Sequence, residues 1–155
     1  MKKSLLFAAL VAAIMLCAAS AATAQTGARR EPDPAVLRDP LMEKDSKHNL
    51  EAARQYFKLK KAYRASLSRA EEIIAGYPNF SLIDEAIYIA GMSNLYLSQN
   101  KGKQPPTLAV EKHREEARIY LSRLVNEYPE SSYRKDAEKG LQSLGGALQK
   151  TESKQ

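Results

Sequence analysis

The sequence is poor in the residues from which most enzymes build an active site. It has one cysteine, Cys17, close to the N-terminus, and two histidines, His48 and His113. With no second cysteine, the chain can build no disulfide framework and no cysteine metal site, and the residues after Cys17 include no thiol nucleophile. The sequence also lacks the motifs of zinc and serine hydrolases, of phosphate-binding loops and of calcium loops. We therefore predict a protein that is not an enzyme and that uses no cofactor and no metal ion.

The two histidines are the residues on which an unrecognised catalytic site would depend. His113 lies on the edge of a predicted helix that also carries Val110 and Ala117. A packed, hydrogen-bonded histidine is favoured there over a metal ligand or a general base. A small hydrolase remains an alternative, which requires a deep polar cleft that places His48 or His113 beside a carboxylate.

The first residues have the pattern of a secretory signal peptide. Lys2 and Lys3 precede an apolar run over residues 5–16. At about twelve residues this run is shorter than the ~20 that a membrane-spanning helix needs. Small residues follow and end in an A-x-A sequence at residues 22–24, the form that signal peptidase cuts. We expect residues 1–24 to be removed and the protein to be exported to the periplasm.

Cys17 stands at the end of the apolar run, where a bacterial lipoprotein carries its lipidated cysteine. The preceding residue, Leu16, is larger than the small residue usual at that position. Two routes stay open: a lipid on Cys17, which would tether the protein to the outer membrane, or cleavage before Gln25, which would leave it untethered. The mass of the mature N-terminus distinguishes the two. Such a lipid is the only membrane contact that the sequence predicts.

The chain is mildly basic, with 24 Lys and Arg against 18 Asp and Glu. The basic residues concentrate locally at Lys58, Lys60, Lys61 and Arg64. Export argues against nucleic acid as a partner. A solvated helix face is the simplest interpretation of this cluster, and an anionic membrane surface or an acidic protein patch is the partner that it would fit. Lys60, Lys61 and Arg64 are therefore candidate partner-binding residues.

Spacings of three and four between apolar residues predict an all-α protein of about five helices. One helical segment runs from Asp45 or Ser46 to Gly76, and its periodicity leaves open whether it is one helix or two. Another runs from near Ser81 to about Gln99. Because this second segment is apolar nearly all round, we expect it to be the central and most buried helix.

In the second half of the chain, loop and capping residues mark the expected boundaries of the helices. Residues 100–106 are polar and contain paired prolines, which predicts a loop. Thr107 is then the expected N-cap of the next helix, which ends at Pro129. Ser131 or Ser132 is the expected N-cap of a last helix.

Together, the export signal and the helical patterns divide the chain into four regions. Residues 1–24 are the signal peptide and residues 25–45 a flexible linker. In this linker Asp33 and Pro34 favour a short helix through Met42, although Pro40 lies inside that span. The helical domain covers residues 46–148. The polar residues 149–155 form a disordered tail.

An internal duplication organises the helical domain. Tyr77-Pro78 and Tyr128-Pro129 each end a helix, with apolar and small residues at matching positions around them. A recurring helix, proline stop and second helix predict a repeat array, in which each unit buries its apolar face against its neighbour. The repeat-defining residues are Ser66, Ala70, Ile73, Tyr77, Pro78, Ala86, Ala117, Leu121, Leu124, Tyr128, Pro129 and Ala137.

The spacing of the repeat resembles that of known helical repeats. Ala117, Leu121, Leu124 and Pro129 have the spacing found in the second half of a tetratricopeptide repeat, and residues 66–78 show it again. The resemblance implies a short tetratricopeptide-like α–α superhelix. Such a fold is a scaffold for binding other proteins.

A closer resemblance is to the later repeats of the BamD (YfiO, ComL) family, outer-membrane lipoproteins of the β-barrel assembly machinery. It rests on an aromatic pair at Tyr56-Phe57, a basic turn at Lys60-Lys61, an Ala62-Tyr63 helix start and the Tyr77-Pro78 stop, and it covers roughly residues 46–144. The resemblance implies a chain turn at Lys60-Lys61. It also implies a periplasmic adaptor that docks a barrel-inserting subunit. A scaffold for cell-wall or division enzymes, built from the same repeat, is the alternative.

Eight tyrosines fall in or beside the predicted helices, mostly on apolar stripes. They are first of all core residues. A tyrosine that stays partly exposed would be an anchor for a bound peptide, because its ring gives large contact area at low entropic cost. We select Tyr88, Tyr96 and Tyr120 as candidate partner-binding residues.

Overall fold

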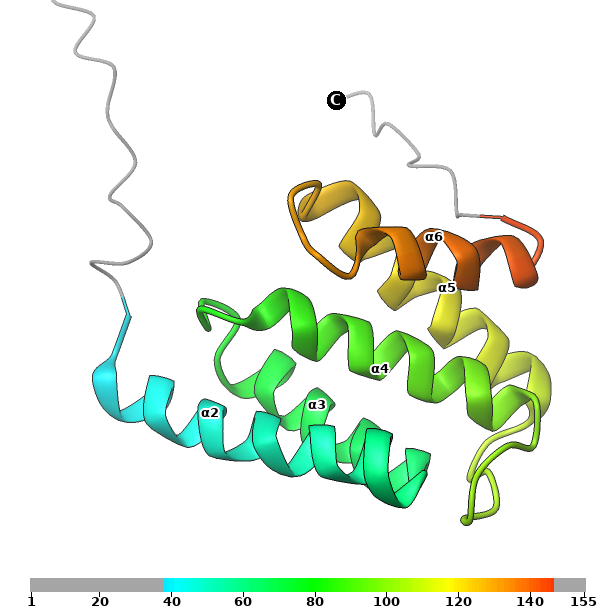
Figure 1. The fold of residues 1–155 in the computed structure, drawn as a ribbon, viewed down its shortest axis with the longest axis horizontal. Helices are drawn as coiled ribbons and strands as arrows, with labels where there is room; N and C mark the ends of the chain where they lie inside the picture. Colours follow the sequence, from blue (N-terminus) through cyan, green and yellow to red (C-terminus); the bar gives the residue numbers. More distant parts are fainter. Residues whose placement is uncertain (1–37, 147–155) are drawn as a thin grey trace, which may run out of the picture. The chain divides into compact units, whose positions relative to one another are not determined.

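Neighbouring helices of the chain pack against each other in order, and the resulting array has two layers. The computed structural model describes residues 38–146, which lie in one unit, Asp33–Gln155. α4 contacts both α2 and α6, and Figure 1 shows these three in front of α3 and α5. The prediction of an all-α, tetratricopeptide-like superhelix is confirmed. The helical elements are α2 (Pro40–Arg54), the π-helical segment η1 (Gln55–Lys60), α3 (Tyr63–Gly76), α4 (Ile83–Ser98), α5 (Val110–Glu127) and α6 (Arg134–Ser143).

The first described helix starts earlier than the sequence suggested. α2 begins at Pro40, so the expected start at Asp45 or Ser46 is wrong and the expected linker over residues 25–45 is too long. The Asp39 carboxylate accepts a hydrogen bond from the backbone N–H of Leu41 at 2.8 Å. A proline fits the first position of a helix because it has no N–H to leave unpaired. The short helix expected from Asp33 through Met42 begins outside the described residues, and its last residues, from Pro40 on, belong to α2.

The segment up to Gly76 consists of two helices, as the family resemblance implied. η1 widens the last turns of α2, and Lys61 then adopts the left-handed conformation with φ 49°. The N–H of Ala62 donates to the carbonyl of Tyr56 at 2.9 Å, which closes this turn. The chain reverses at Lys61-Ala62 without a glycine or a proline.

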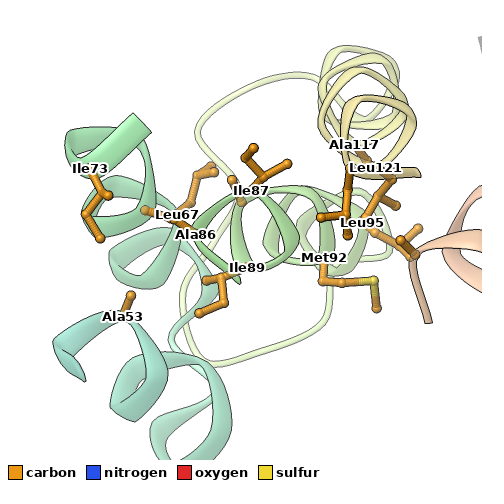
Figure 2. Close-up of a cluster of buried hydrophobic side chains, with 14 of the residues drawn as sticks. Ala53, Leu67, Ile73, Ala86, Ile87, Ile89, Met92, Leu95, Ala117 and Leu121 are labelled. Carbon is orange, nitrogen blue, oxygen red and sulfur yellow. The ribbon is translucent and has the colours of Figure 1, made fainter. Parts of the chain in front are cut away.

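α4 is the central helix, which confirms the expectation for this segment. Figure 2 shows Ala53, Leu67 and Ile73 on one side of α4 and Ala117 and Leu121 on the other. Since α3 and α5 cover opposite faces of α4, nearly all of its side chains are removed from water. Its buried apolar residues are Ile83, Ala86, Ile87, Ile89, Ala90, Met92, Leu95 and Leu97.

The duplicated Tyr-Pro sequences build matching turns. The N–H of Tyr77 donates to Ile73 at 2.9 Å, and the N–H of Tyr128 donates to Leu124 at 3.0 Å. Each tyrosine carbonyl then accepts from an N–H three residues later, at 3.0 Å in both turns. The two prolines are exposed at the turns. The other repeat-defining residues are buried, except for the partly buried Tyr128.

Small residues at the helix crossings allow α4 and α6 to pack closely against α5. Leu121 of α5 is fully buried and lies between Gly91 of α4 and Gly140 of α6. A Cβ atom at position 91 would come within 2.6 Å of the Leu121 Cδ2 atom, and one at position 140 within 2.9 Å of its Cδ1 atom. Only glycine at these two positions leaves room for the leucine.

Two expected helix caps differ from the structure. α5 begins at Val110 after Ala109, so Thr107 is not its N-cap. α6 begins at Arg134 after Tyr133 and has no side-chain cap. Ser131 instead stabilises the turn before α6, where its Oγ atom accepts a hydrogen bond from the N–H of Tyr133 at 3.2 Å. The predicted tail, residues 149–155, lies outside the described residues.

Candidate functional site

An aromatic band of five side chains runs from η1 and the start of α3 along α4 to the turn before α6. We give this name to Phe57, Tyr63, Tyr88, Tyr96 and Tyr133. The Tyr96 ring centroid lies 4.7 Å from that of Tyr63 and 5.8 Å from that of Phe57. Tyr88 stacks on Tyr133 with centroids 4.7 Å apart, and the Phe57 ring lies 6.3 Å from Tyr88. The band therefore connects η1, α3, α4 and the turn before α6.

A shallow groove of about 420 Å³ lies beside the band, between α4 and α6. Tyr88 and Tyr96 both line it, since a separation of eight residues places them on one face of α4. Burial raises the pKa of Tyr88 to about 12, and the Asp136 carboxylate adds to this shift. The hydroxyl thus stays protonated at neutral pH. The other lining residues are Met92, Leu95, Gln99, Lys101, Asp136, Lys139, Gly140 and Ser143.

Tyr120, the third selected tyrosine, lies elsewhere. Its hydroxyl donates to the Glu71 carboxylate at 3.4 Å, which ties α5 to α3 in the other layer. Burial raises the Tyr120 pKa to about 12, with Glu71 and Glu116 adding to the shift. The structure therefore brings Tyr88 and Tyr96 together but separates Tyr120 from them.

An ion pair that sequence reasoning missed connects the front-layer helices. Arg54 of α2 donates to both oxygens of Glu85 of α4, at 2.6 and 2.5 Å. The Tyr133 hydroxyl also donates to this carboxylate. Burial alone would raise the pKa of Glu85, but these hydrogen bonds outweigh burial and hold the pKa below its usual value. Arg54 and Glu85 lie on different helices, so no spacing rule pairs them.

The basic candidates Lys60, Lys61 and Arg64 are exposed around the turn that joins η1 to α3. The structure adds Lys101 and Lys103 to them, because the loop after α4 docks on this turn. The N–H of Lys103 donates to the carbonyl of Lys61 at 3.1 Å. This grouping could not be predicted from the sequence, in which the two segments are far apart.

His113 belongs to a buried chain of hydrogen bonds. Its Nε2 atom accepts from the N–H of Leu108 at 3.3 Å, so the proton is on Nδ1. Nδ1 then donates to the Asn94 side-chain oxygen at 2.7 Å. The Asn94 amide in turn donates to the Ala90 carbonyl. The imidazole links the loop before α5 to α4. His48, the other histidine, is exposed on α2.

This chain of hydrogen bonds predicts a loss of stability in mild acid. Burial lowers the pKa of His113 below 6.5, and Glu116 offsets part of this shift. The unfolded chain then binds a proton more readily than the folded protein. The stability should be complete above about pH 6.5 and fall by at most ~1.4 kcal/mol per pH unit below it, until the folded pKa is reached. Urea unfolding at a series of pH values measures this.

Two substitutions distinguish the contribution of His113 to the pH dependence of stability from that of other acid-sensitive groups. His113→Gln should flatten the pH dependence of stability between pH 6.5 and the onset of carboxylate protonation. His48→Gln, a change at the exposed histidine, should leave the wild-type dependence in place. Equal slopes in both variants would contradict the assignment to His113.

Within residues 38–146, no three or more His, Cys, Asp or Glu side chains converge as metal ligands would. In the same part of the chain, none of the helices has the length and apolar character needed to cross a membrane. Cys17, the candidate lipidation residue, lies outside it.

Comparison with known proteins supplies the family. Residues 25–154 match the model of the YfiO family, described as outer membrane lipoprotein. Neither the curated proteins nor the solved structures contain a match. Because the family match covers most of the chain, the protein belongs to the YfiO family of outer membrane lipoproteins, which confirms the resemblance drawn from its repeats.

Proposed function

We propose that the protein is a non-enzymatic scaffold that binds a protein partner in the assembly of outer-membrane β-barrel proteins. Membership in a family of outer membrane lipoproteins places it in the cell envelope, exported to the periplasmic side of the outer membrane. As the only cysteine, Cys17 is the one residue to which a thioether-linked lipid can attach. We include this lipid in the proposal.

The observation that carries the proposal is the groove between α4 and α6. Tyr88 and Tyr96 line it with partly buried rings, which pack against the other three rings of the aromatic band and against the core. Tyrosines held in this way lose little side-chain entropy when a partner covers them. Lys101, Lys139 and Asp136 supply polar groups among the other lining residues. A groove of this kind fits a peptide segment or a helix of a partner with mixed polar and apolar side chains.

A scaffold for cell-wall or division enzymes would use the same surface, so the partner separates the two candidates. The hydrolase alternative gains no support, because His113 is fully buried and hydrogen bonds to an amide instead of a carboxylate.

Photocrosslinking from the groove tests the proposal in intact cells. A photoreactive amino acid at Gln99 or Ser143 should crosslink to a barrel-assembly subunit, because both residues line the groove without contributing to the core. The matched control is the same amino acid at Ile119, which is exposed on α5. Adducts with cell-wall or division enzymes would favour the alternative. Equal adducts from groove and control positions would contradict a role for the groove.

A further inference from the structure

Two turns far apart in the sequence form one basic surface at an end of the array. We call this surface the basic end; it consists of Lys58, Lys60, Lys61, Arg64, Lys101 and Lys103. Besides the Lys103 bond to Lys61, the side-chain oxygen of Gln104 accepts from the N–H of Ala65 at 3.1 Å. Gly102 fits between the two turns with φ 97°, and a Cβ atom there would lie 2.6 Å from the Lys61 carbonyl oxygen. The lysines of the loop are therefore held in place.

Among the described residues, the basic end is compensated only at one edge, where the charge of Lys58 helps to lower the pKa of Glu85. All six side chains are exposed, and none forms an ion pair with a carboxylate of residues 38–146. Residues 55–65 and 99–110 contain no Asp or Glu. Lys60 and Lys101 lie over the rings of Tyr56 and Tyr96, at 4.7 and 5.5 Å from the centroids. A surface of like charge whose cations form no ion pairs attracts an anionic partner.

Fold stability explains only part of this charge. Lys58 and Lys60 are in the last turn of η1, where cations interact favourably with the helix dipole. Arg64 is in the first turn of α3, where a cation is unfavourable, and that turn has no acidic residue. Lys101 and Lys103 belong to no helix. At least half of the basic end therefore needs another explanation.

An exposed apolar side chain lies at the edge of the basic end, where Leu59 and Lys58 line a shallow hollow with Glu51, Arg54 and Gln55. Leu59 stands between Lys58 and Lys60 and is 78% exposed, more than any other large apolar side chain of residues 38–146. An acidic protein patch would pair with the lysines but offers no apolar environment to this leucine. A lipid surface satisfies both, because the lysines meet the phosphates while the leucine enters the region between the headgroups.

We propose that the basic end contacts the surface of a membrane that contains anionic phospholipid, with Leu59 inserted among the headgroups. The family membership puts the protein beside such a surface. This contact adjoins the groove, because Lys101 lines the groove and belongs to the basic end, but it does not depend on the proposed function. Together with a lipid on the N-terminal segment, it would hold the array in a fixed orientation, since two weak membrane signals act together.

A tryptophan reporter tests the contact, because the chain contains no tryptophan. The full chain carrying Leu59→Trp is mixed with vesicles that contain phosphatidylglycerol. We expect its emission to shift to the blue, and brominated lipid to quench it. Vesicles of phosphatidylcholine alone should give no shift, and high salt should remove the shift, because salt screens the lysines. The control is Leu82→Trp, which reports from the opposite end of α3 and α4 and should not respond.

Charge variants in the reporter background complete the test. Lys60→Glu with Lys103→Glu should weaken the vesicle affinity by at least about tenfold, given ~1 kcal/mol for each cation near an anionic surface. The control pair Lys44→Glu with Lys135→Glu makes the same change in net charge at exposed residues outside the basic end and should weaken it much less. Absence of a blue shift with the anionic vesicles would overturn the proposal. A shift caused only by polyglutamate would overturn it too, and would assign the basic end to an acidic protein.

Discussion

Replacing Gly91 with leucine should destabilise the protein by about 3 kcal/mol or more, the upper part of the range for overpacked cores. A Cβ atom at this position would lie 2.6 and 2.7 Å from the Leu121 Cδ2 and Cγ atoms, and 3.3 Å from the Leu121 backbone nitrogen. A different Leu121 rotamer cannot relieve the contact with the backbone, so α5 has to move away from α4. Urea unfolding followed by far-ultraviolet circular dichroism measures the loss.

The same substitution at Gly76 is the matched control. Gly76 is the exposed last residue of α3, and a Cβ atom there meets nothing within 4 Å. Gly76→Leu should leave stability unchanged or raise it by up to ~0.5–1 kcal/mol, because glycine is a poor helix residue. The double change Gly91→Leu with Leu121→Ala should recover part of the loss by vacating the space. Equal stability of the two single variants would contradict the close crossing of α4 and α5.

The duplication made the fold predictable. Tyr77-Pro78 and Tyr128-Pro129 mark helix ends by local chemistry, since proline lacks a donor and restricts the residue before it. Apolar spacing then assigned the faces of the helices between them, including the burial of α4 on two sides. These signals lie within a few residues of each other in the chain. Features that depend on such local signals can be predicted from a single sequence.

Other features depend on contacts between distant segments. The reversal at Lys61-Ala62 has no glycine or proline, and the carbonyl of Lys61 is instead paired with Lys103 across the array. Helix periodicity could not find this turn; only the family resemblance implied it. The start of α2 was misplaced for another reason: the Asp39 cap and Pro40 in the first turn set it, ahead of the residues where the apolar spacing becomes regular.

In the candidate site, too, some features follow from local sequence signals and others only from contacts between distant segments. Tyr88 and Tyr96 could be placed together because they share a helix and a face. Tyr120 is on another helix, and only the packing of α5 on α4 decides that it faces Glu71. When neighbouring helices cover several faces of a helix, the sequence of that helix does not show which of its tyrosines stay exposed. The prediction of three binding tyrosines therefore combined one pair that shares the groove with one residue of the other layer.

Breaking the ion pair between Arg54 and Glu85 should produce the second large effect. Arg54→Met keeps most of the apolar stem but leaves the Glu85 carboxylate, a residue that is 4% exposed, with Tyr133 as its remaining donor. Removing one partner of a buried pair costs ~3–5 kcal/mol. The Arg54 side chain is 38% exposed, so solvent already screens the pair. We therefore expect a loss of about 2–3 kcal/mol at pH 7.

The dependence of this loss on pH identifies its cause. In the wild type the lowered pKa of Glu85 adds stability that is present above the ordinary value of 4.5 and disappears as the pH falls through the folded pKa. In Arg54→Met only the Tyr133 hydrogen bond and the Lys58 charge still oppose burial, the largest influence on this carboxyl, so its pKa rises and the variant gains stability on acidification. The gap between the two proteins should therefore narrow between pH 7 and pH 4.5. Arg54→Met with Glu85→Gln should recover most of the loss at pH 7, because the neutral amide needs no cation. A gap that stays constant with pH, without recovery in the double variant, would mean that Arg54 acts through packing and not through charge.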